Sequence, residues 1–362
     1  MDIGIPKEIK VHEYRVGATP YSVREFVARG HRVLVERDAG AAIGFDDEDY
    51  RAAGAEVVDA AAEVYARAEL VVKIKEPQPA ECRLLRPGQI LFAYLHLAAD
   101  PEQARLLMAS GCTAIAYETV TGAGGGLPLL APMSEVAGRM AIQAGATCLE
   151  LAHGGAGLLL GGVPGVAAAK VVILGGGVVG LNAARMAVGL GARVSVIDRD
   201  IGRLRRIDEL LGNRVRTQLA AAAAIERLVT DADLVIGAVL IPGAATPRLV
   251  PREWLARMRR GSVLVDVAID QGGCFETSRP TTHAEPTYVV DGVVHYCVTN
   301  MPGAVARTST FALDNATLPY ALALADKGMA RALAEDPGLA AGLNVDRGRI
   351  TCAPVAEALG FC

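Results

Sequence analysis

A cluster of glycines near the middle of the chain has a spacing suited to phosphate binding. Gly175, Gly177 and Gly180 follow a short apolar run at residues 171–174 and precede an alanine-rich, helix-compatible segment. In a strand–turn–helix, the first glycine permits a tight turn, the second lets the backbone approach a pyrophosphate, and the third lets helix and strand pack closely. The helix N-terminus then offers unpaired N–H groups to phosphate oxygens. The pattern therefore predicts a dinucleotide site.

An acidic residue stands where the next strand should end. Residues 192–197 read as a β-branched strand, and Asp198 follows it. A carboxylate at this place accepts both hydroxyls of an adenosine ribose and repels a 2′-phosphate. Arg199 and Arg203 follow this acid in the sequence and could instead bind a 2′-phosphate, which keeps NADP as the alternative. We expect NAD.

Three ionisable residues follow other predicted strands. Lys75 comes after a strand at residues 70–74, His96 after one at 90–95, and Asp270 soon after Val267. Ligands of open α/β sheets collect at such strand ends, and an imidazole can transfer protons near neutral pH. Each of these residues also fits a purely structural role. A histidine between two leucines is often a core residue, an aspartate before Gln-Gly-Gly is often a turn residue, and a lysine is often only surface charge.

The elements that would position these residues form two α/β halves. Strand-like apolar runs alternate with helical segments before residue 120 and again between residues 170 and 298. This alternation predicts two doubly wound, Rossmann-like domains with parallel sheets, separated by a cleft and joined by helices. Residues 1–130 and 306–362 would form a discontinuous substrate domain, and residues 131–305 the NAD-binding domain. From Thr308 onward we expect mostly helix.

Composition narrows the class of protein. The 362 residues are 52% hydrophobic but only 4% aromatic, which suits closely packed α/β layers. A net charge of −4 argues against a nucleic-acid surface, and there is no targeting signal or transmembrane run, so a cytoplasmic protein is expected. The seven cysteines lack C-x-x-C spacing, which predicts reduced, buried thiols and no metal site.

Short motifs across the chain resemble one family. They resemble the alanine dehydrogenases, whose family includes the nucleotide-binding part of proton-translocating nicotinamide nucleotide transhydrogenase. The resemblance runs from residue 3 to about residue 320 and is carried by Ile5–Lys10, Arg15-Val16, Lys73–Pro77, Tyr94–Ala98, Tyr117–Thr119, Pro132–Met140, Val239–Gly243, Asp266–Gly273 and Asn300–Ala304.

The resemblance implies a reaction and roles for five residues. L-alanine, NAD and water would give pyruvate, ammonium and NADH. Arg15 and Lys75 would hold the substrate carboxylate, since a guanidinium fork and an ammonium group can share one anion. His96 would be the general acid/base, and Asp270 would face it across the cleft and orient the attacking water. Asn300 would contact the nicotinamide or the substrate.

The resemblance also implies residues around the cofactor and an assembly. Ser134, which we expect to cap a helix linking the domains, would touch the cofactor. The fingerprint glycines, Asp198 and the helix start would line the phosphates and ribose, and further residues the nicotinamide, although several of these apolar positions fit a plain core equally well. The expected residues are Ser134, Gly175, Gly177, Val178, Val179, Gly180, Asp198, Arg203, Val239, Leu240, Val267, Ala268, Ile269, Arg279, Val298, Thr299 and Met301. A homohexamer is also implied.

Some positions depart from the family, and two other functions are weighed. Leu151 and Ala156 stand where basic residues are common, and Ala220 replaces a hydroxyl residue of some members. One alternative is the soluble NAD(H)-binding component of a transhydrogenase, but the sequence around Ser134 has the dehydrogenase form. The other is a catalytically silent NAD sensor, which need not keep Lys75 and His96.

Overall fold

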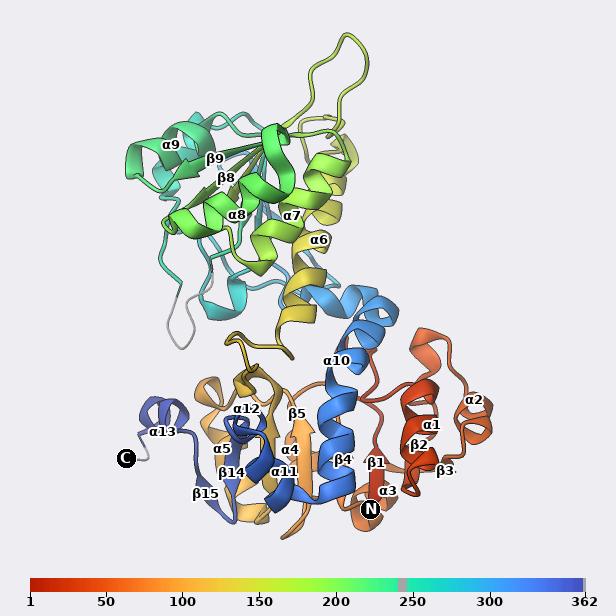
Figure 1. The fold of residues 1–362 in the computed structure, drawn as a ribbon. Helices are drawn as coiled ribbons and strands as arrows, with labels where there is room; N and C mark the ends of the chain where they lie inside the picture. Colours follow the sequence, from red (N-terminus) through yellow and green to blue (C-terminus); the bar gives the residue numbers. More distant parts are fainter. Residues whose placement is uncertain (240–245, 361–362) are drawn as a thin grey trace. The chain divides into compact units, whose positions relative to one another are not determined.

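A computed structural model describes residues 1–239 and 246–360. The chain divides into two compact units (Figure 1). Unit 1 combines Met1–Met133 with Gly303–Cys362, and unit 2 is the continuous stretch Ser134–Pro302.

Unit 1 is built on a mixed sheet that is mostly parallel. Within the described residues its strands lie in the order β15-β14-β6-β5-β4-β1-β2-β3. Six neighbouring strands are parallel to one another, in the spatial order β6, β5, β4, β1, β2 and β3. The strand β14 runs antiparallel to both β6 and β15. The strands are β1 Asp2–Ile5, β2 Arg32–Glu36, β3 Glu56–Val58, β4 Leu70–Val72, β5 Ile90–Ala93, β6 Thr113–Ala116, β14 Leu343–Asp346 and β15 Arg349–Ile350.

The direction of winding reverses between β1 and β4. From β1 the chain adds β2 and β3 on one side, and then returns to add β4, β5 and β6 on the other. Every residue of β4, β5 and β6 is buried, as strands covered on both faces must be. The α-helices of this unit are α1 Pro20–Ala28, α2 Asp47–Ala52, α3 Ala61–Arg67, α4 Pro79–Cys82, α5 Pro101–Ser110, α10 Ala306–Lys327, α11 Met329–Glu335, α12 Pro337–Ala340 and α13 Ala353–Leu359.

Unit 2 repeats the same plan. Its strand order is β12-β13-β11-β10-β7-β8-β9, with the reversal between β7 and β10 and an antiparallel edge strand β12. The strands are β7 Lys170–Leu174, β8 Arg193–Asp198, β9 Val215–Leu219, β10 Leu234–Gly237, β11 Val263–Asp266, β12 Thr287–Val290 and β13 Val293–Tyr296. The main helices are α6 Ala131–Cys148, α7 Val178–Gly189, α8 Ile201–Leu211 and α9 Ala222–Thr230.

Two doubly wound α/β halves were expected, and this fold class is confirmed. Two details differ. Antiparallel strands extend one side of each sheet. In addition, α6 begins at Ala131, so Ser134 lies inside the helix and the prediction that it caps the N-terminus is wrong. Pro132 explains the earlier start, because proline has no N–H to leave unsatisfied and its φ suits the first helical turn.

An uncharged arm projects from unit 2 between α6 and β7. It is the yellow-green loop that extends beyond the helices in Figure 1. Residues 154–169 are all Gly, Ala, Leu, Val or Pro. The arm closes on itself through a bridge between Val163 and Val166, and Leu159 and Val166 are 67% and 63% exposed.

Candidate active site

The glycine fingerprint of unit 2 has the geometry of a phosphate cradle. Gly175 has φ 105°, and a Cβ there would lie 2.6 Å from the Ala238 carbonyl oxygen. At Gly180 a Cβ would lie 1.8 Å from the Gly175 carbonyl oxygen, because α7 crosses β7 closely. Gly177 differs from both, since a Cβ there meets no atom within 4 Å. Two glycines thus build the turn, and the third leaves open space at the start of α7, the place at which such fingerprints bind phosphate groups in other proteins.

Asp198 ends β8 and holds the fingerprint loop in place. Its side chain is 4% exposed. One carboxylate oxygen accepts a hydrogen bond from the Gly176 N–H at 2.6 Å, and the other accepts one from the Asp200 N–H at 2.8 Å. Each oxygen has a second lone pair, so the carboxylate can still receive ribose hydroxyls. Arg203 Nη1 lies 3.6 Å from Asp198 Oδ2, so the arginine is drawn toward the two acids Asp198 and Asp200.

The other residues expected around the cofactor differ in burial. Val178 is exposed, and six of these residues are half-buried, namely Ser134, Val179, Val239, Val267, Ala268 and Thr299. Ile269, Val298 and Met301 are at least 95% buried within unit 2. The exposed Arg279 places its guanidinium 4.2 Å from the centre of the Tyr288 ring. Leu240 lies outside the described residues.

Asp270 and Asn300 follow β11 and β13. Asp270 is exposed in a 3₁₀ turn, Ile269–Gln271, and Asn300 is half-buried with φ 56°. The loop that carries Asp270 is organised by Asp266, a fully buried carboxylate that sequence reasoning missed. Asp266 accepts hydrogen bonds from the Ala268 and Cys274 N–H groups, at 3.1 and 2.7 Å, and one from Ser278 Oγ at 2.5 Å. Burial raises the pKa of Asp266, although these hydrogen bonds oppose the shift.

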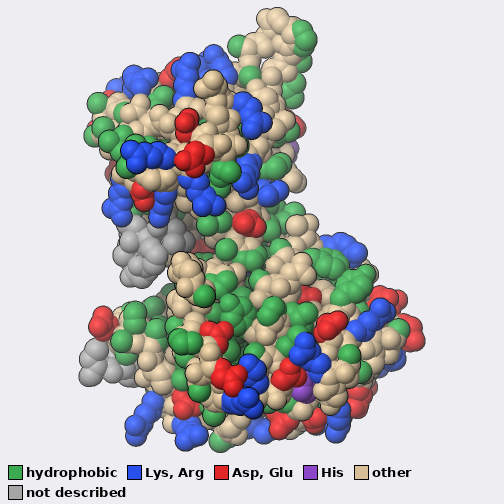
Figure 2. Space-filling view, in the orientation of Figure 1, with side chains coloured by type: hydrophobic (Ala, Val, Ile, Leu, Met, Phe, Trp, Pro, Cys, Tyr) green, Lys and Arg blue, Asp and Glu red, His purple; other side chains and the backbone are tan. Residues whose placement is uncertain are grey.

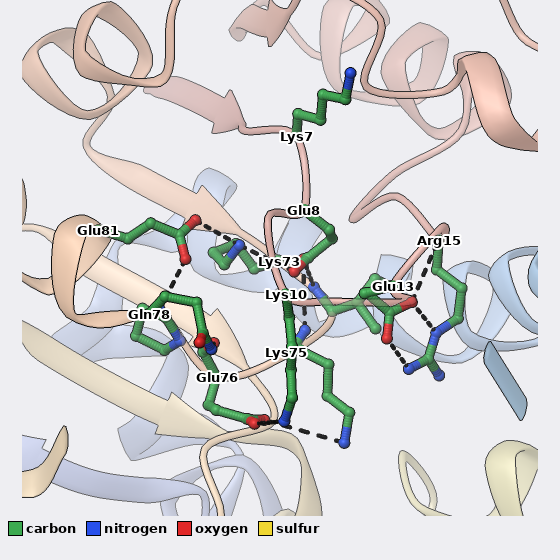
Figure 3. Close-up of polar contacts among 12 residues, drawn as sticks. Lys7, Glu8, Lys10, Glu13, Arg15, Lys73, Lys75, Glu76, Gln78 and Glu81 are labelled. Atoms are coloured by element: carbon green, nitrogen blue, oxygen red, sulfur yellow. Dashed lines mark hydrogen bonds and ion pairs between the residues drawn. The ribbon is translucent and has the colours of Figure 1, made fainter. Parts of the chain in front are cut away.

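In unit 1, polar residues follow the carboxyl ends of the central strands. Figure 3 shows those that follow β1 and β4, including both cations expected to bind substrate, Arg15 and Lys75. The Lys75 side chain is 12% exposed, and its Nζ lies 4.0 Å from Glu76 Oε2. Lys10 donates to the other oxygen of Glu76. Burial raises the pKa of Glu76, but the charges of Lys75 and Lys10 outweigh it and the net shift is downward.

Arg15 is buried and forms a two-pronged ion pair with Glu13. Its Nε donates to Glu13 Oε1 at 2.6 Å and its Nη2 to Glu13 Oε2 at 2.5 Å. Its Nη1 lies 3.1 Å from the sulfur of Met133. Burial lowers the pKa of Arg15, but its hydrogen bonds to the Glu13 carboxylate and the charge of that carboxylate outweigh this, so the pKa is raised and the guanidinium stays charged. Sequence reasoning did not single out Glu13, which fixes one edge of the guanidinium.

His96 follows β5 and is not a core residue. Its side chain is 44% exposed and its backbone has φ 50°, a left-handed conformation that histidine rarely adopts. The Glu118 carboxylate, which follows β6, accepts the His96 N–H at 2.6 Å and the Leu95 N–H at 3.2 Å. His96 Nδ1 lies 3.8 Å from Glu118, and the ring stacks on Tyr94 with a centroid distance of 5.7 Å. Glu118 is therefore a third residue, after Asp266 and Glu13, that sequence reasoning did not assign to the site.

Parallel pairing brings the expected residues to one edge of each sheet. In unit 1, Arg15, Lys75 and His96 follow β1, β4 and β5, which are neighbours. In unit 2, the fingerprint and Asp270 follow strands on either side of the reversal point, where open α/β sheets bind ligands. Over residues 1–239 and 246–360, no His, Cys, Asp or Glu residues group as metal ligands, and no helix could cross a membrane.

The strand order and the fingerprint together define an α/β protein with a Rossmann-type dinucleotide site. Family models narrow the class. The alanine dehydrogenase/PNT N-terminal domain matches residues 4–137, and the alanine dehydrogenase/PNT C-terminal domain matches residues 141–353. The chain belongs to the alanine dehydrogenase/PNT family.

Individual relatives separate the two branches of that family. An alanine dehydrogenase from Halomonas elongata is 62% identical over 361 residues, which cover 100% of this chain and 97% of that protein. A solved L-alanine dehydrogenase is 55% identical, with a TM-score of 0.97 over 100% of this chain and 99% of that one. A transhydrogenase from Sinorhizobium meliloti is 25% identical, with a TM-score of 0.85 over 97% and 100% of the two chains. The dehydrogenase branch is thus the nearer one.

Proposed function

We propose that this protein catalyses the reversible, NAD-dependent oxidative deamination of L-alanine to pyruvate and ammonium. One observation carries the proposal. In unit 1, two cations and an exposed histidine follow adjacent parallel strands, on a chain whose other unit bears a dinucleotide fingerprint. The names and high identity of the relatives support alanine as the substrate. The transhydrogenase alternative has only the more distant likeness.

Unit 2 would bind NAD. The space in front of Gly177 and the carboxylate of Asp198 fit a pyrophosphate and a ribose, respectively. Ser134, the apolar residues after β10, β11 and β13, and Arg279 would complete the site. When bound, NAD takes up the two electrons and the hydrogen that leave the substrate carbon. The chain supplies position, charge and proton transfer.

Unit 1 would bind the substrate. Arg15 and Lys75 would share the carboxylate of alanine or pyruvate, as a fork and a point charge. Glu13 holds one edge of the Arg15 guanidinium, so that the plane of the guanidinium keeps a fixed direction. A substrate whose carboxylate is held in this way presents its Cα in one orientation, which favours the reaction.

His96 and Asp270 would handle the water and the protons. Once alanine is oxidised to its imine, a water molecule must add to carbon and ammonia must leave. His96 would take a proton from the water and return it to the departing nitrogen, with Asp270 orienting the water and Asn300 contacting the nicotinamide or substrate. The exposure of the His96 side chain supports this role, because a proton carrier needs access.

A direct assay tests the proposal. Formation of NADH from NAD is followed at alkaline pH with a panel of L-amino acids, and formation of NADPH is followed when NADP replaces NAD. L-alanine with NAD should give the highest kcat/KM. Absence of turnover with every amino acid, despite NADH binding, would leave a sensor or a hydride carrier as the function.

The assembly and location are also part of the proposal. A homo-oligomer is supported by the uncharged arm at residues 154–169, since exposed apolar segments often lie at subunit contacts. The number of six subunits rests on the family resemblance alone. On the face that Figure 2 shows, this arm is green and tan, that is, hydrophobic side chains with backbone and other side chains, and it carries no Lys, Arg, Asp, Glu or His. Light scattering coupled to gel filtration measures the subunit number. The expected cytoplasmic location stays a prediction, testable by cell fractionation.

A further inference from the structure

Three charged side chains lie in the interior of unit 1, beside the loop that bears Lys75. Glu8, Lys73 and Glu81 have side chains that are 2%, 0% and 3% exposed. The Lys73 ammonium donates to Glu81 at 2.7 Å and to Glu8 at 3.1 Å, so it joins the two carboxylates (Figure 3). Burial lowers the pKa of Lys73, but the two carboxylates outweigh it and the net shift is upward, so the ammonium stays charged.

Each carboxylate of this triad also holds the backbone of the loop at residues 74–78. Glu8 Oε1 accepts the N–H of Ile74 at 2.7 Å and that of Lys75 at 3.4 Å. Glu81 Oε2 accepts the N–H of Gln78 at 2.8 Å. The backbone of the loop is thus hydrogen-bonded to Glu8 near one end and to Glu81 at the other, and the buried Lys73 ammonium connects these two carboxylates. Lys75 lies between them.

Stability alone does not account for three buried charges at this place. Desolvating charged groups is unfavourable, and replacing a buried ion cluster by packed apolar residues is often neutral or stabilising. Such a cluster does fix geometry, because each hydrogen bond constrains both distance and direction. The neighbouring strands β1 and β4 place it at the reversal point of the sheet, where the substrate cations also lie.

We propose that Glu8, Lys73 and Glu81 are positioning residues, which hold the 74–78 loop in the conformation that lets Lys75 bind the substrate carboxylate. The proposal rests on the proposed function for the identity of the substrate. A side chain on a long flexible stem binds an anion well only if its backbone is fixed, since otherwise binding must also order the loop. The triad would meet that requirement before substrate arrives.

The test uses two shape-conserving variants in the full-length protein. Glu81→Gln and Glu8→Gln each weaken the hydrogen bonds and the ion pair at one end of the loop while keeping the side-chain volume. Both should raise KM for L-alanine and for pyruvate at least about tenfold, equal to 1.4 kcal/mol. The Kd for NADH should change less than about twofold. Leu107→Ala is the matched control, because this buried residue of α5 lies outside the triad and its loss destabilises the same unit. It should leave KM unchanged.

Two further measurements separate positioning from general damage. In a double-mutant cycle, Glu81→Gln should add little to the rise in KM that Lys75→Ala already causes, because both act on the same contact. Hydrogen exchange needs no turnover: the amides of Ile74 and Gln78 should exchange faster in the corresponding Gln variants and not in Leu107→Ala. The proposal is overturned if the amides of Ile74 and Gln78 exchange at the wild-type rate in both Gln variants. It is also overturned if the effects of Glu81→Gln and Lys75→Ala on KM are additive. If wild type does not oxidise alanine, the proposed function fails, and hydrogen exchange still decides the role of the triad.

Discussion

Gly177→Ala is the sharpest test of the dinucleotide site. The substitution adds one methyl group where the structure has no atom within 4 Å, at φ −71°, so the folded protein should accept it. A pyrophosphate bound by the fingerprint would occupy that space. Forcing a methyl group into a close contact costs about 1–3 kcal/mol. Since 1.4 kcal/mol is tenfold, NADH affinity should fall by about fivefold to 150-fold.

Titration of NADH fluorescence and a thermal melt, run on three variants, give the answer. Gly177→Ala should melt like wild type but bind NADH weakly. Gly189→Ala is the matched control in the same helix, with equally open space, and should bind normally and be up to about 1 kcal/mol more stable. Gly180→Ala should lose stability and binding together, because its Cβ would meet the Gly175 carbonyl oxygen. The same NADH affinity in Gly177→Ala and wild type would refute the assignment of the phosphate site.

Three other predictions concern cofactor choice, substrate binding and proton transfer. Asp198→Ala should reduce the preference for NAD over NADP, measured as the ratio of the two kcat/KM values. It should also lower the free energy of unfolding by about 1–3 kcal/mol, because two N–H groups lose their acceptor. Comparable wild-type activity with both cofactors contradicts the assignment of Asp198 to the ribose. Lys75→Ala should sharply reduce turnover of alanine but leave NADH binding nearly intact; an equal loss of both would remove Lys75 from the substrate site. His96→Ala and Asp270→Ala should each lower turnover at least about a hundredfold without unfolding. Near-normal turnover in His96→Ala contradicts the mechanism.

Local patterns in the sequence predicted the parts of the fold that depend on neighbouring residues. The glycine spacing from Gly175 to Gly180 specifies a turn, and the structure has that turn. Continuous apolar runs located the central strands, and a parallel sheet then required the residues after them to share an edge. For this reason the sequence placed Lys75 and His96 at one edge of a sheet without any knowledge of their contacts.

Features that depend on distant residues were not predictable in this way. Lys73 belongs to a predicted strand, yet its ammonium group is paired with Glu81 and with Glu8, which lies 65 residues away in sequence. A lysine inside an apolar run was the available signal, because a buried charge needs a partner. Similarly, the left-handed backbone of His96 depends on Glu118, which follows another strand. The strand β14 was missed because Leu343–Asp346 lies in a stretch expected to be mostly helical, and its pairing with β6 is long-range.

The pairing of β14 with β6 has a consequence for synthesis on the ribosome. Residues 1–133 emerge before unit 2, but their sheet is incomplete until β14 and β15, which end at Ile350, have been made. Until then β6 presents an open row of N–H and C=O groups, to which strands of other nascent chains can add. Unit 2 is one continuous stretch and can fold during translation. Unit 1 therefore begins to emerge before unit 2 but is completed after it.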